Sequence, residues 1–292
     1  MDSVYHPCKM RKIFSICFLL LFCLGVGKAW HYAKDGFSIQ RVRPWNAAER
    51  YPLSLEAKKI LNQSFKYIAR GHQCYAFASE DGKYVLKLPR TDKYQTPFWA
   101  KAFPQFFKQI EKGIKWRENF VFKSFQIAYE ELHKETALIA FRTGSDKTIQ
   151  GHFQVIDRLG RKYTLPIGKT AFLLQKKMPI LMRVFEDALA KGDRTLAARI
   201  LDSFIQIIYD RASKGIFNKD PSFKKNFGFD GEKAYQIDVG SFYRQDGMGG
   251  LLAIHKAVKD TIDPVRKWLK TKDPELVDYL NVKIDLLVRN QP

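Results

Sequence analysis

Cysteine is scarce, and the few cysteines stand where they cannot build a structural framework. Of the four cysteines in 292 residues, Cys8, Cys17 and Cys23 lie in or before an N-terminal apolar run, which leaves only Cys74 beyond it. A single thiol cannot close an intrachain disulfide, so the folded part is not a disulfide scaffold and its cysteine usage identifies no compartment. The sequence has no Cys-x-x-Cys pair and no His/Cys cluster that suggests zinc.

Acidic residues are also in the minority. The chain has 30 Asp and Glu against 50 Lys and Arg, a formal net charge of +20. This balance favours an anionic partner (nucleotide, phospholipid surface or nucleic acid) without choosing among them. No internal repeat or low-complexity tract is present, and a hydrophobic content of 46% with 14% aromatic residues excludes a disordered chain.

The N-terminus carries the one long hydrophobic run. The uncharged stretch from Ile13 to Gly27 follows three basic residues and ends at Lys28. As a helix it would span roughly 22 Å, which is short of the roughly 30 Å of a bilayer core and favours a signal peptide. Residues 1–29 are therefore expected to be a signal peptide, cleaved before Trp30, or a retained short membrane anchor.

The next part of the chain predicts an N-terminal lobe built on an antiparallel sheet. An extension over residues 30–60 ends in a short helix at 53–61, and two turns then join three strands. The strands are expected at residues 65–69, 74–79 and 84–88. The second turn contains Asp81-Gly82, a strong hairpin signal.

A helix and more strands complete this lobe. Apolar residues recur on one side of residues 124–141, which predicts a helix there. Strands are expected at 153–156, 163–166 and 170–175. Five or so antiparallel strands with one helix inserted after the third would make up residues 61–178.

The remainder, residues 179–292, reads as a smaller, mainly helical lobe. Helices are expected at residues 184–191, 194–213, 264–270 and 274–288 and near 248–261. Asp193 is the predicted N-cap of the second of these helices.

A lysine in the third strand is the first candidate functional residue. In Tyr84-Val85-Leu86-Lys87, alternation puts Val85 and Lys87 on the same face of the strand. A lysine on a face that overlooks a cleft could contact phosphates, whereas an ordinary strand lysine faces water.

An acid, an amide and a second acid follow more than a hundred residues later. Asp220 and Asn226 share one loop, and Asp238 stands two residues before Gly240 at the end of a short strand. With Lys87, these residue types are the parts needed to hold Mg²⁺-ATP and transfer its terminal phosphoryl group. A generic Asp-x-Gly turn is the alternative for Asp238.

The order and spacing of these motifs over about residues 60–245 resemble the protein-kinase-like superfamily, in particular aminoglycoside phosphotransferases and lipopolysaccharide-core kinases. The resemblance implies a bilobal α+β fold with ATP and Mg²⁺ between the lobes. It further implies that Lys87 contacts the nucleotide phosphates, that Asp220 accepts the proton of an acceptor hydroxyl, and that Asn226 and Asp238 bind Mg²⁺.

The resemblance also assigns three further roles. The turn at Gly71 would cover the phosphates, and Gln175 and Lys176 would form the hinge beside adenine. Among the glutamates of the predicted helix, Glu135 best matches the family's partner of the strand lysine, with Glu131 one turn earlier and Glu130 also available.

Three departures from the family pattern bear on activity. Asn218-Lys219 stands where many protein kinases have His-Arg, and Asp220 and Asn226 are six positions apart instead of five. The turn at Gly71 also keeps only the middle glycine of the family's loop. Either the catalytic loop bulges by one residue or the metal geometry differs.

Residues 98–125 form an aromatic and basic stretch outside these motifs. They would either pack as an insertion with their lysines in water or lie on an anionic membrane surface. The insertion is the simpler interpretation.

The leading hypothesis is an ATP-dependent phosphotransferase acting on an unknown hydroxyl of a small molecule, lipid, carbohydrate or protein. The rival hypotheses are a catalytically inactive membrane-tethered or secreted pseudokinase that serves as a binding module, and a basic lipid- or nucleic-acid-binding protein. Nucleic acid is the least favoured partner, and the N-terminal run predicts a membrane-associated or secreted protein, on a side of the membrane that the flanking charges leave open.

Overall fold

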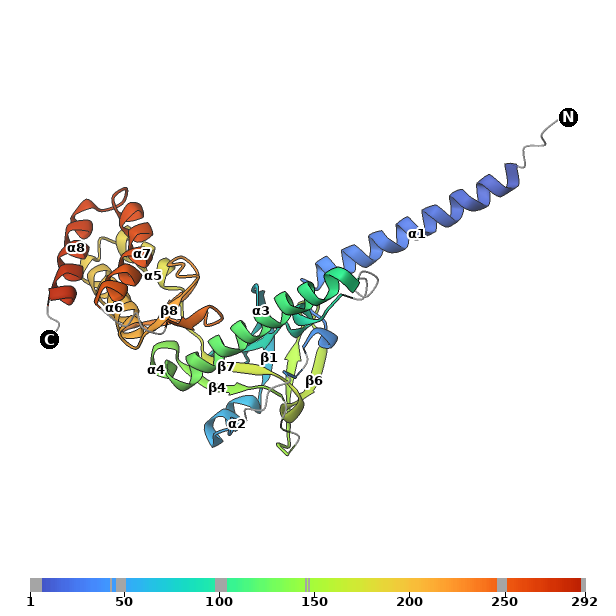
Figure 1. Cartoon of the computed structure of the whole chain (residues 1–292), viewed down its shortest axis with the longest axis horizontal. Helices are drawn as coiled ribbons and strands as arrows, with labels where there is room; N and C mark the ends of the chain where they lie inside the picture. Colours follow the sequence, from blue (N-terminus) through green and yellow to red (C-terminus); the bar gives the residue numbers. More distant parts are fainter. Residues whose placement is uncertain are drawn as a thin grey trace.

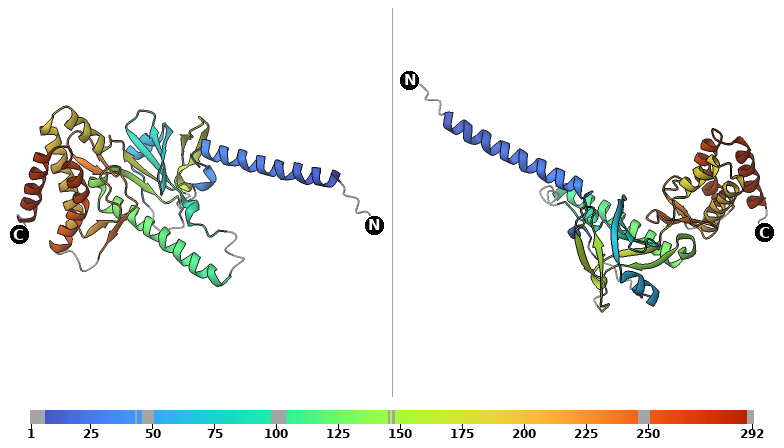
Figure 2. Two further views of the ribbon diagram at one scale, coloured as in Figure 1. Left: turned by 90° about the horizontal axis from the view of Figure 1, so that it is seen from above. Right: turned by 180° about the vertical axis from the view of Figure 1, so that it is seen from behind.

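A long helix projects from one end of the molecule. The computed structural model describes residues 7–42, 44–45, 51–97, 104–144, 146, 148–245 and 251–289. Helix α1 (Pro7–Ala33) extends away from the body (Figures 1 and 2), and the ring of Trp30 at its inner end stacks under the guanidinium of Arg161 at 4.9 Å.

Within α1, the 20 residues Phe14–Ala33 have a mean hydropathy of 1.6 and are not buried by the protein. By length and composition alone they could cross a membrane, since 20 residues make about 30 Å of helix. The helix continues past Lys28 to Ala33, so the candidate span is longer than the uncharged run from Ile13 to Gly27.

The N-terminal lobe is a seven-stranded sheet in the order β4-β7-β3-β2-β1-β5-β6. Helix α2 (Leu55–Leu61) precedes it, and Ser54 caps this helix by accepting from the N–H of Ala57 at 3.1 Å. The strands are β1 (Ser64–Arg70), β2 (Cys74–Ser79), β3 (Tyr84–Pro89), β4 (Leu138–Arg142), β5 (His152–Ile156), β6 (Lys162–Pro166) and β7 (Phe172–Lys176).

The predicted three-stranded ribbon is confirmed. Strands β1, β2 and β3 pair antiparallel, and the turn between β2 and β3 has Gly82 at φ 72°. The carboxylate of Asp81 accepts from the hydroxyl of Ser79 at 2.6 Å and from the N–H of Lys83 at 3.0 Å. Gly82 therefore supplies the positive φ of this turn, and Asp81 closes the turn with local hydrogen bonds, as the Asp-Gly pair predicts.

The expectation of a purely antiparallel lobe is wrong at one strand pair. Strand β5 runs parallel to β1, with Phe65 opposite Val155. Parallel strands need a long crossover, and here β2, β3, helices α3 (Pro104–Glu130) and α4 (His133–Thr136) and β4 all lie between the two in the sequence. Pairing over such a sequence distance leaves no local signature.

The predicted helix over residues 124–141 is also wrong at both ends. Helix α3 runs from Pro104 to Glu130, a short α4 (His133–Thr136) follows, and Leu138 already begins β4. Ala137 has φ 53°, a left-handed conformation that ends the helical path. The apolar run in β4 pairs with β7, which overrides its helical periodicity.

Much of the aromatic and basic stretch at 98–125 is therefore the first part of α3. Residues 98–103 of that stretch lie outside the described part of the chain.

The C-terminal lobe is mainly helical (Figure 1). Asp193 caps α6 as predicted, because its carboxylate accepts from the N–H of Leu196 at 2.9 Å. The elements are α5 (Leu181–Ala190), α6 (Arg194–Ser213), α7 (Leu251–Leu269) and α8 (Pro274–Arg289), with two small antiparallel pairs, β8 (Ile216–Asn218) with β11 (Phe242–Arg244) and β9 (Phe227–Phe229) with β10 (Ala234–Gln236).

The break predicted between residues 261 and 264 is absent, since α7 continues through Pro264. Ile254, Val258, Ile262 and Val265 are all buried on one face of this helix. The continuous apolar stripe packs on the lobe core and outweighs the loss of one backbone hydrogen bond at the proline.

Separate hydrophobic cores support the two lobes. One core lies within the helical lobe, around Phe204 and Phe227, and another lies within the sheet, around Phe65 and Phe77. A third joins α3 to β4, β7 and the β8–β11 pair. The structure confirms the predicted α+β class, with an N-terminal lobe built on a sheet and a reduced, mainly helical C-terminal lobe.

Candidate active site

The strand lysine reaches across to the C-terminal lobe. Lys87 lies in β3, between β2 and β7, and its ammonium group donates a hydrogen bond to the carbonyl of Ile237. Burial lowers the pKa of Lys87, and the nearby carboxylate of Asp238 partly opposes that shift. The structure thus brings Lys87 to the residue before Asp238, although 150 positions separate Lys87 from Ile237.

Asp238 follows β10 and is held by the loop that contains Asp220 and Asn226. The N–H groups of Ile237 and Asp238 both donate to the carbonyl of Asn226, at 2.8 and 3.3 Å. The Asp238 side chain is exposed, and one of its oxygens accepts from the N–H of Gly240 at 3.4 Å. Asp238 therefore presents a carboxylate at the boundary between the lobes.

The loop from Asp220 to Asn226 has a hydrogen bond at each end. The N–H of Asp220 donates to the Asn218 side chain at 2.9 Å, and the amide nitrogen of Asn226 donates to the Asp220 carbonyl at 2.8 Å. The N–H of Asn226 also donates to the carbonyl of Ser222 at 3.0 Å. This extra turn of chain accommodates the six-residue spacing between the acid and the amide.

Asn226 and Asp238 have the donor atoms that Mg²⁺ prefers. The nitrogen of the buried Asn226 amide is already bonded to Asp220, which leaves its oxygen as the atom able to bind a cation. An amide oxygen and one carboxylate are hard oxygen ligands, and a magnesium site of this kind is completed by substrate phosphates and water. Among the described residues no cluster of three or more His, Cys, Asp or Glu could hold a metal by itself.

Glu135 does not meet Lys87. Its carboxylate pairs instead with Lys214 of the C-terminal lobe at 2.5 Å, and Lys214 also donates to the carbonyl of Glu131 at 3.1 Å. The side chain of Glu131 forms an ion pair with Arg244. The pairing of Glu135 with Lys87 that the resemblance implies is therefore not formed, because Glu135 lies in α4, beyond the end of the long helix.

Ser124 is a residue that sequence reasoning missed. Its hydroxyl is fully buried in α3, donates to the carbonyl of Val239 at 2.6 Å and accepts from the N–H of Phe242 at 2.6 Å. Helix α3 thus contacts the segment carrying Asp238 through a serine. A lone serine within an amphipathic helix gives no sequence signal of such a contact.

The turn at Gly71 faces the same segment. The side-chain nitrogen of Gln73 donates to the carbonyl of Gly240 at 2.7 Å. Gly71 has no positive φ, in contrast to Gly82, so a left-handed backbone does not explain the glycine. A Cβ at Gly71 would lie 3.4 Å from the carbonyl oxygen of Cys74.

The predicted hinge residues occupy the end of β7. Gln175 is buried and donates from its side chain to the carbonyl of Thr136 at 2.5 Å, whereas the side chain of Lys176 is exposed. The N–H of Lys176 donates to the carbonyl of Ala137 at 3.1 Å. A role for either residue beside adenine stays a prediction.

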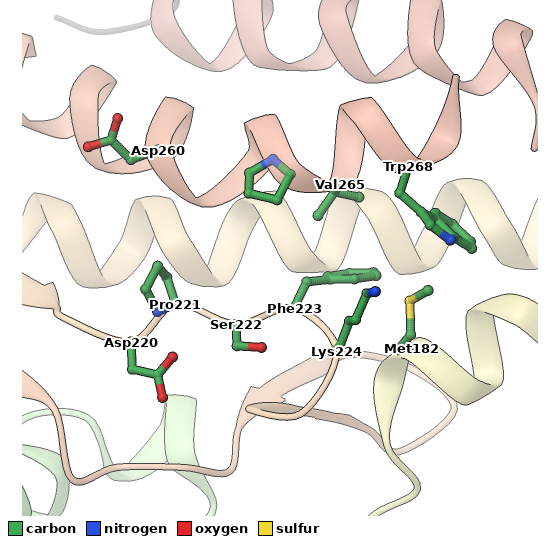
Figure 3. Close-up of a pocket in the computed structure, with 10 residues that line it drawn as sticks. Met182, Asp220, Pro221, Ser222, Phe223, Lys224, Asp260, Val265 and Trp268 are labelled. Carbon is green, nitrogen blue, oxygen red and sulfur yellow. The ribbon is translucent and has the colours of Figure 1, made fainter. Parts of the chain in front are cut away.

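A cavity of about 330 Å³ lies beside the loop from Asp220 to Asn226, between that loop and α7. Its apolar wall includes Phe223, Val265 and Trp268, and Asp220 lies at its edge (Figure 3). This is the size of a small-molecule pocket.

No family model and no curated protein sequence match the chain. Two solved structures of WbdD do match, one of them described as a bifunctional kinase-methyltransferase. Both are 16% identical to this chain, with TM-scores of 0.35 and 0.37, and the matches cover 75% and 77% of it. The chain spans 43% and 46% of the length of those structures.

Proposed function

We propose that this protein is an ATP-dependent phosphotransferase that transfers the terminal phosphoryl group of ATP to a hydroxyl acceptor. One observation carries the proposal: Lys87, Asp220, Asn226 and Asp238 belong to a single hydrogen-bonded set. Lys87 bonds to Ile237, Ile237 and Asp238 bond to Asn226, and Asn226 bonds to Asp220. These bonds link three separate segments of the chain, which carry an ammonium group, an amide and two carboxylates.

Each residue has a role that its surroundings support. Lys87 would bind the α and β phosphates of the nucleotide, and its desolvated ammonium would gain a counter-charge there. The turn at Gly71 would cover the phosphates, and Gln175 and Lys176 would lie beside the base.

Asn226 and Asp238 would hold Mg²⁺ through their oxygens. The ion, when bound, neutralises the charge of the phosphate groups. The hydrogen bonds that Asn226 donates and accepts would keep both ligands at a fixed separation.

Asp220 would orient the acceptor hydroxyl and accept its proton. Its carboxylate is exposed, and the apolar cavity at its edge offers room for the body of a small acceptor. The acceptor class remains open to a small molecule, lipid, carbohydrate or protein hydroxyl.

Thermal unfolding of the full chain in detergent, with and without Mg²⁺-ATP, tests the proposal. Nucleotide at one hundred times its Kd should add about 2.7 kcal/mol to the free energy of unfolding. Removing Mg²⁺ with EDTA, or changing Asp238→Asn, should abolish most of that gain, whereas Glu232→Gln in an exposed turn should not. No stabilisation at millimolar Mg²⁺-ATP would rule out the proposed activity.

Lys87→Met gives a second comparison within the same measurement. The variant should lose the stabilisation by nucleotide but unfold at no lower temperature, because it removes an ammonium group that is costly to bury. Release of ADP upon addition of acceptor extracts then distinguishes an active enzyme from a protein that binds nucleotide without turnover.

A further inference from the structure

The turn between β1 and β2 is held from one side by the segment that follows β3. The N–H of Arg90 donates to the carbonyl of Gln73 at 2.7 Å, and the guanidinium of Arg90 lies 3.5 Å from the carbonyl of Gly71. The ammonium of Lys93, in the short helix η2 (Thr91–Tyr94), donates to the carbonyl of His72 at 2.5 Å. Three successive carbonyls of the turn therefore point toward residues 90–93.

The N–H groups of the turn point the other way. In each planar peptide unit the C=O and the following N–H are opposed, so carbonyls engaged at Gly71 and His72 direct the N–H groups of His72 and Gln73 away from residues 90–93. Among the described residues neither of these N–H groups has an acceptor. Adjacent free N–H groups in a turn form an anion-binding concavity.

The charges around the turn favour an anion. The pKa of His72 is lowered, first by the charge of Lys93 and then by burial and Arg90. Burial and the charge of Arg90 likewise lower the pKa of Lys93. These groups repel one another, and a bound anion would relieve that repulsion.

The position of the turn identifies which anion fits. The side chain of Gln73 bonds to Gly240, two residues after Asp238, and the carboxylate of Asp238 is the one acid that acts on the pKa of His72. The guanidinium of Arg90 is fixed over the ring of Tyr75 at 5.3 Å. The free N–H groups therefore lie where a polyphosphate chain could bridge the turn and the Asp238 segment.

We propose that Arg90 and Lys93 are positioning residues for the phosphates of the nucleotide. They hold the carbonyls of the turn from behind, so that His72 and Gln73 present their N–H groups to the polyphosphate. The inference rests on the proposed function. It adds to that function a charged clamp, made of Arg90 and Lys93, which would hold a turn that keeps only one glycine of the family's loop.

The test compares phosphate-bearing and phosphate-free probes on the full chain in detergent. Affinities are measured by calorimetry for ATP, ADP, inorganic tripolyphosphate and adenosine. Lys93→Ala and Arg90→Ala should weaken binding of ATP and tripolyphosphate by about tenfold or more, because each removes a charged hydrogen-bond donor. Adenosine binding should be unchanged, and Lys93→Arg and Arg90→Lys should restore most of the affinity for ATP.

Lys66→Ala is the matched control, since Lys66 is exposed on β1 and carries the same charge. If Lys93→Ala and Arg90→Ala bind ATP as Lys66→Ala does, the clamp is overturned while the proposed function stands. An equal loss of ATP and adenosine would mean a merely structural role and would also overturn it. If the unaltered chain binds neither ATP nor tripolyphosphate, the proposed function and the clamp both fail.

A variant that unfolds is replaced by Lys93→Gln, which keeps a long polar side chain without the charge. The same ratio of ATP to adenosine affinity then decides the result.

Discussion

Cys74 is the one cysteine of the folded domain, and it lies among the charged residues of the candidate site. Burial raises the pKa of its thiol to about 12, while the positive charge of Lys87 opposes this shift and Asp238 adds to it. Lys87, in turn, responds electrostatically to both Cys74 and Asp238. These three side chains therefore share one environment, and the thiol can report on what enters it.

Alkylation of Cys74 should depend on pH in a distinctive way. Only the thiolate reacts with the alkylating reagent. At pH values below the pKa of Cys74, the alkylation rate should therefore rise about tenfold per pH unit, from about pH 8 to about pH 10. A free thiol with a pKa of about 8.5 levels off within that range. Peptide mapping by mass spectrometry separates Cys74 from Cys8, Cys17 and Cys23.

Saturating Mg²⁺-ATP should slow the same reaction if the nucleotide enters the cleft beside Lys87. A plateau in the Cys74 rate below about pH 9 would contradict the raised pKa of the thiol. Unchanged alkylation in the presence of a nucleotide that binds would contradict its place in the cleft.

At the level of elements, α3 and α4 divide between them what the family resemblance assigned to one helix. Helix α3 contacts the Asp238 segment through Ser124, whereas α4 contributes Glu135 to an ion pair with Lys214. The Ser124 hydroxyl bonds to two backbone groups at once, the carbonyl of Val239 and the N–H of Phe242. The position of Asp238 relative to the sheet thus depends on a neutral buried side chain.

Replacing Ser124 by alanine should lower the free energy of unfolding and weaken Mg²⁺-dependent nucleotide binding together. The change leaves a buried carbonyl and a buried N–H without partners, at a cost of about 1 to 3 kcal/mol each at most. Chemical denaturation measures the first effect, and Mg²⁺ titration of nucleotide affinity measures the second.

Ser203→Ala provides the control for that experiment. Ser203 accepts from the N–H of Ala234 at 2.5 Å, on a helix of the C-terminal lobe. Loss of the Ser203 hydroxyl should lower the free energy of unfolding without changing the Mg²⁺ dependence of nucleotide affinity. If both substitutions change that Mg²⁺ dependence equally, Ser124 has no special coupling to Asp238.

On the scale of the whole molecule, α1 and the helical lobe lie at opposite ends (Figure 2). The N-terminal lobe connects them, and its sheet contacts the C-terminal lobe through Lys87 and Gln73. Away from these contacts, Lys214 forms an ion pair with Glu135 of α4, and Arg244 forms one with Glu131, just after α3. If α1 is retained in a bilayer, this arrangement places the cavity beside Asp220 well away from the membrane.

If α1 is retained as a membrane anchor rather than cleaved, the full chain should resist alkaline extraction from membranes. Leu20→Arg together with Leu24→Arg should release it, because each arginine at the centre of a spanning helix costs about 2.5 to 3.5 kcal/mol. Leu55→Arg, at an exposed leucine of α2, is the matched control and should remain in the membrane fraction.

N-terminal sequencing of the recovered protein separates the two alternatives for this segment. A chain that begins near Trp30 would indicate a cleaved signal peptide, and it would contradict retention of α1 as an anchor.

Local patterns in the sequence determined a large part of this protein. The ribbon of β1, β2 and β3 and the start of α6 at Asp193 were predictable, because caps and turns depend on neighbouring residues. The place of Lys87 in a strand was predictable in the same way, whereas the roles of Lys87, Asp220, Asn226 and Asp238 stay predictions.

Tertiary structure decided the rest, because those features depend on partners distant in the chain. The pairing of β5 with β1, the conversion of residues 138–142 into a strand and the continuity of α7 through Pro264 each follow from a surface that the element packs against. The same holds for Glu135, which binds Lys214, and for Ser124, whose two backbone partners lie more than a hundred residues away. Burial and long-range pairing outweigh local preference at these positions, so the sequence by itself cannot reveal them.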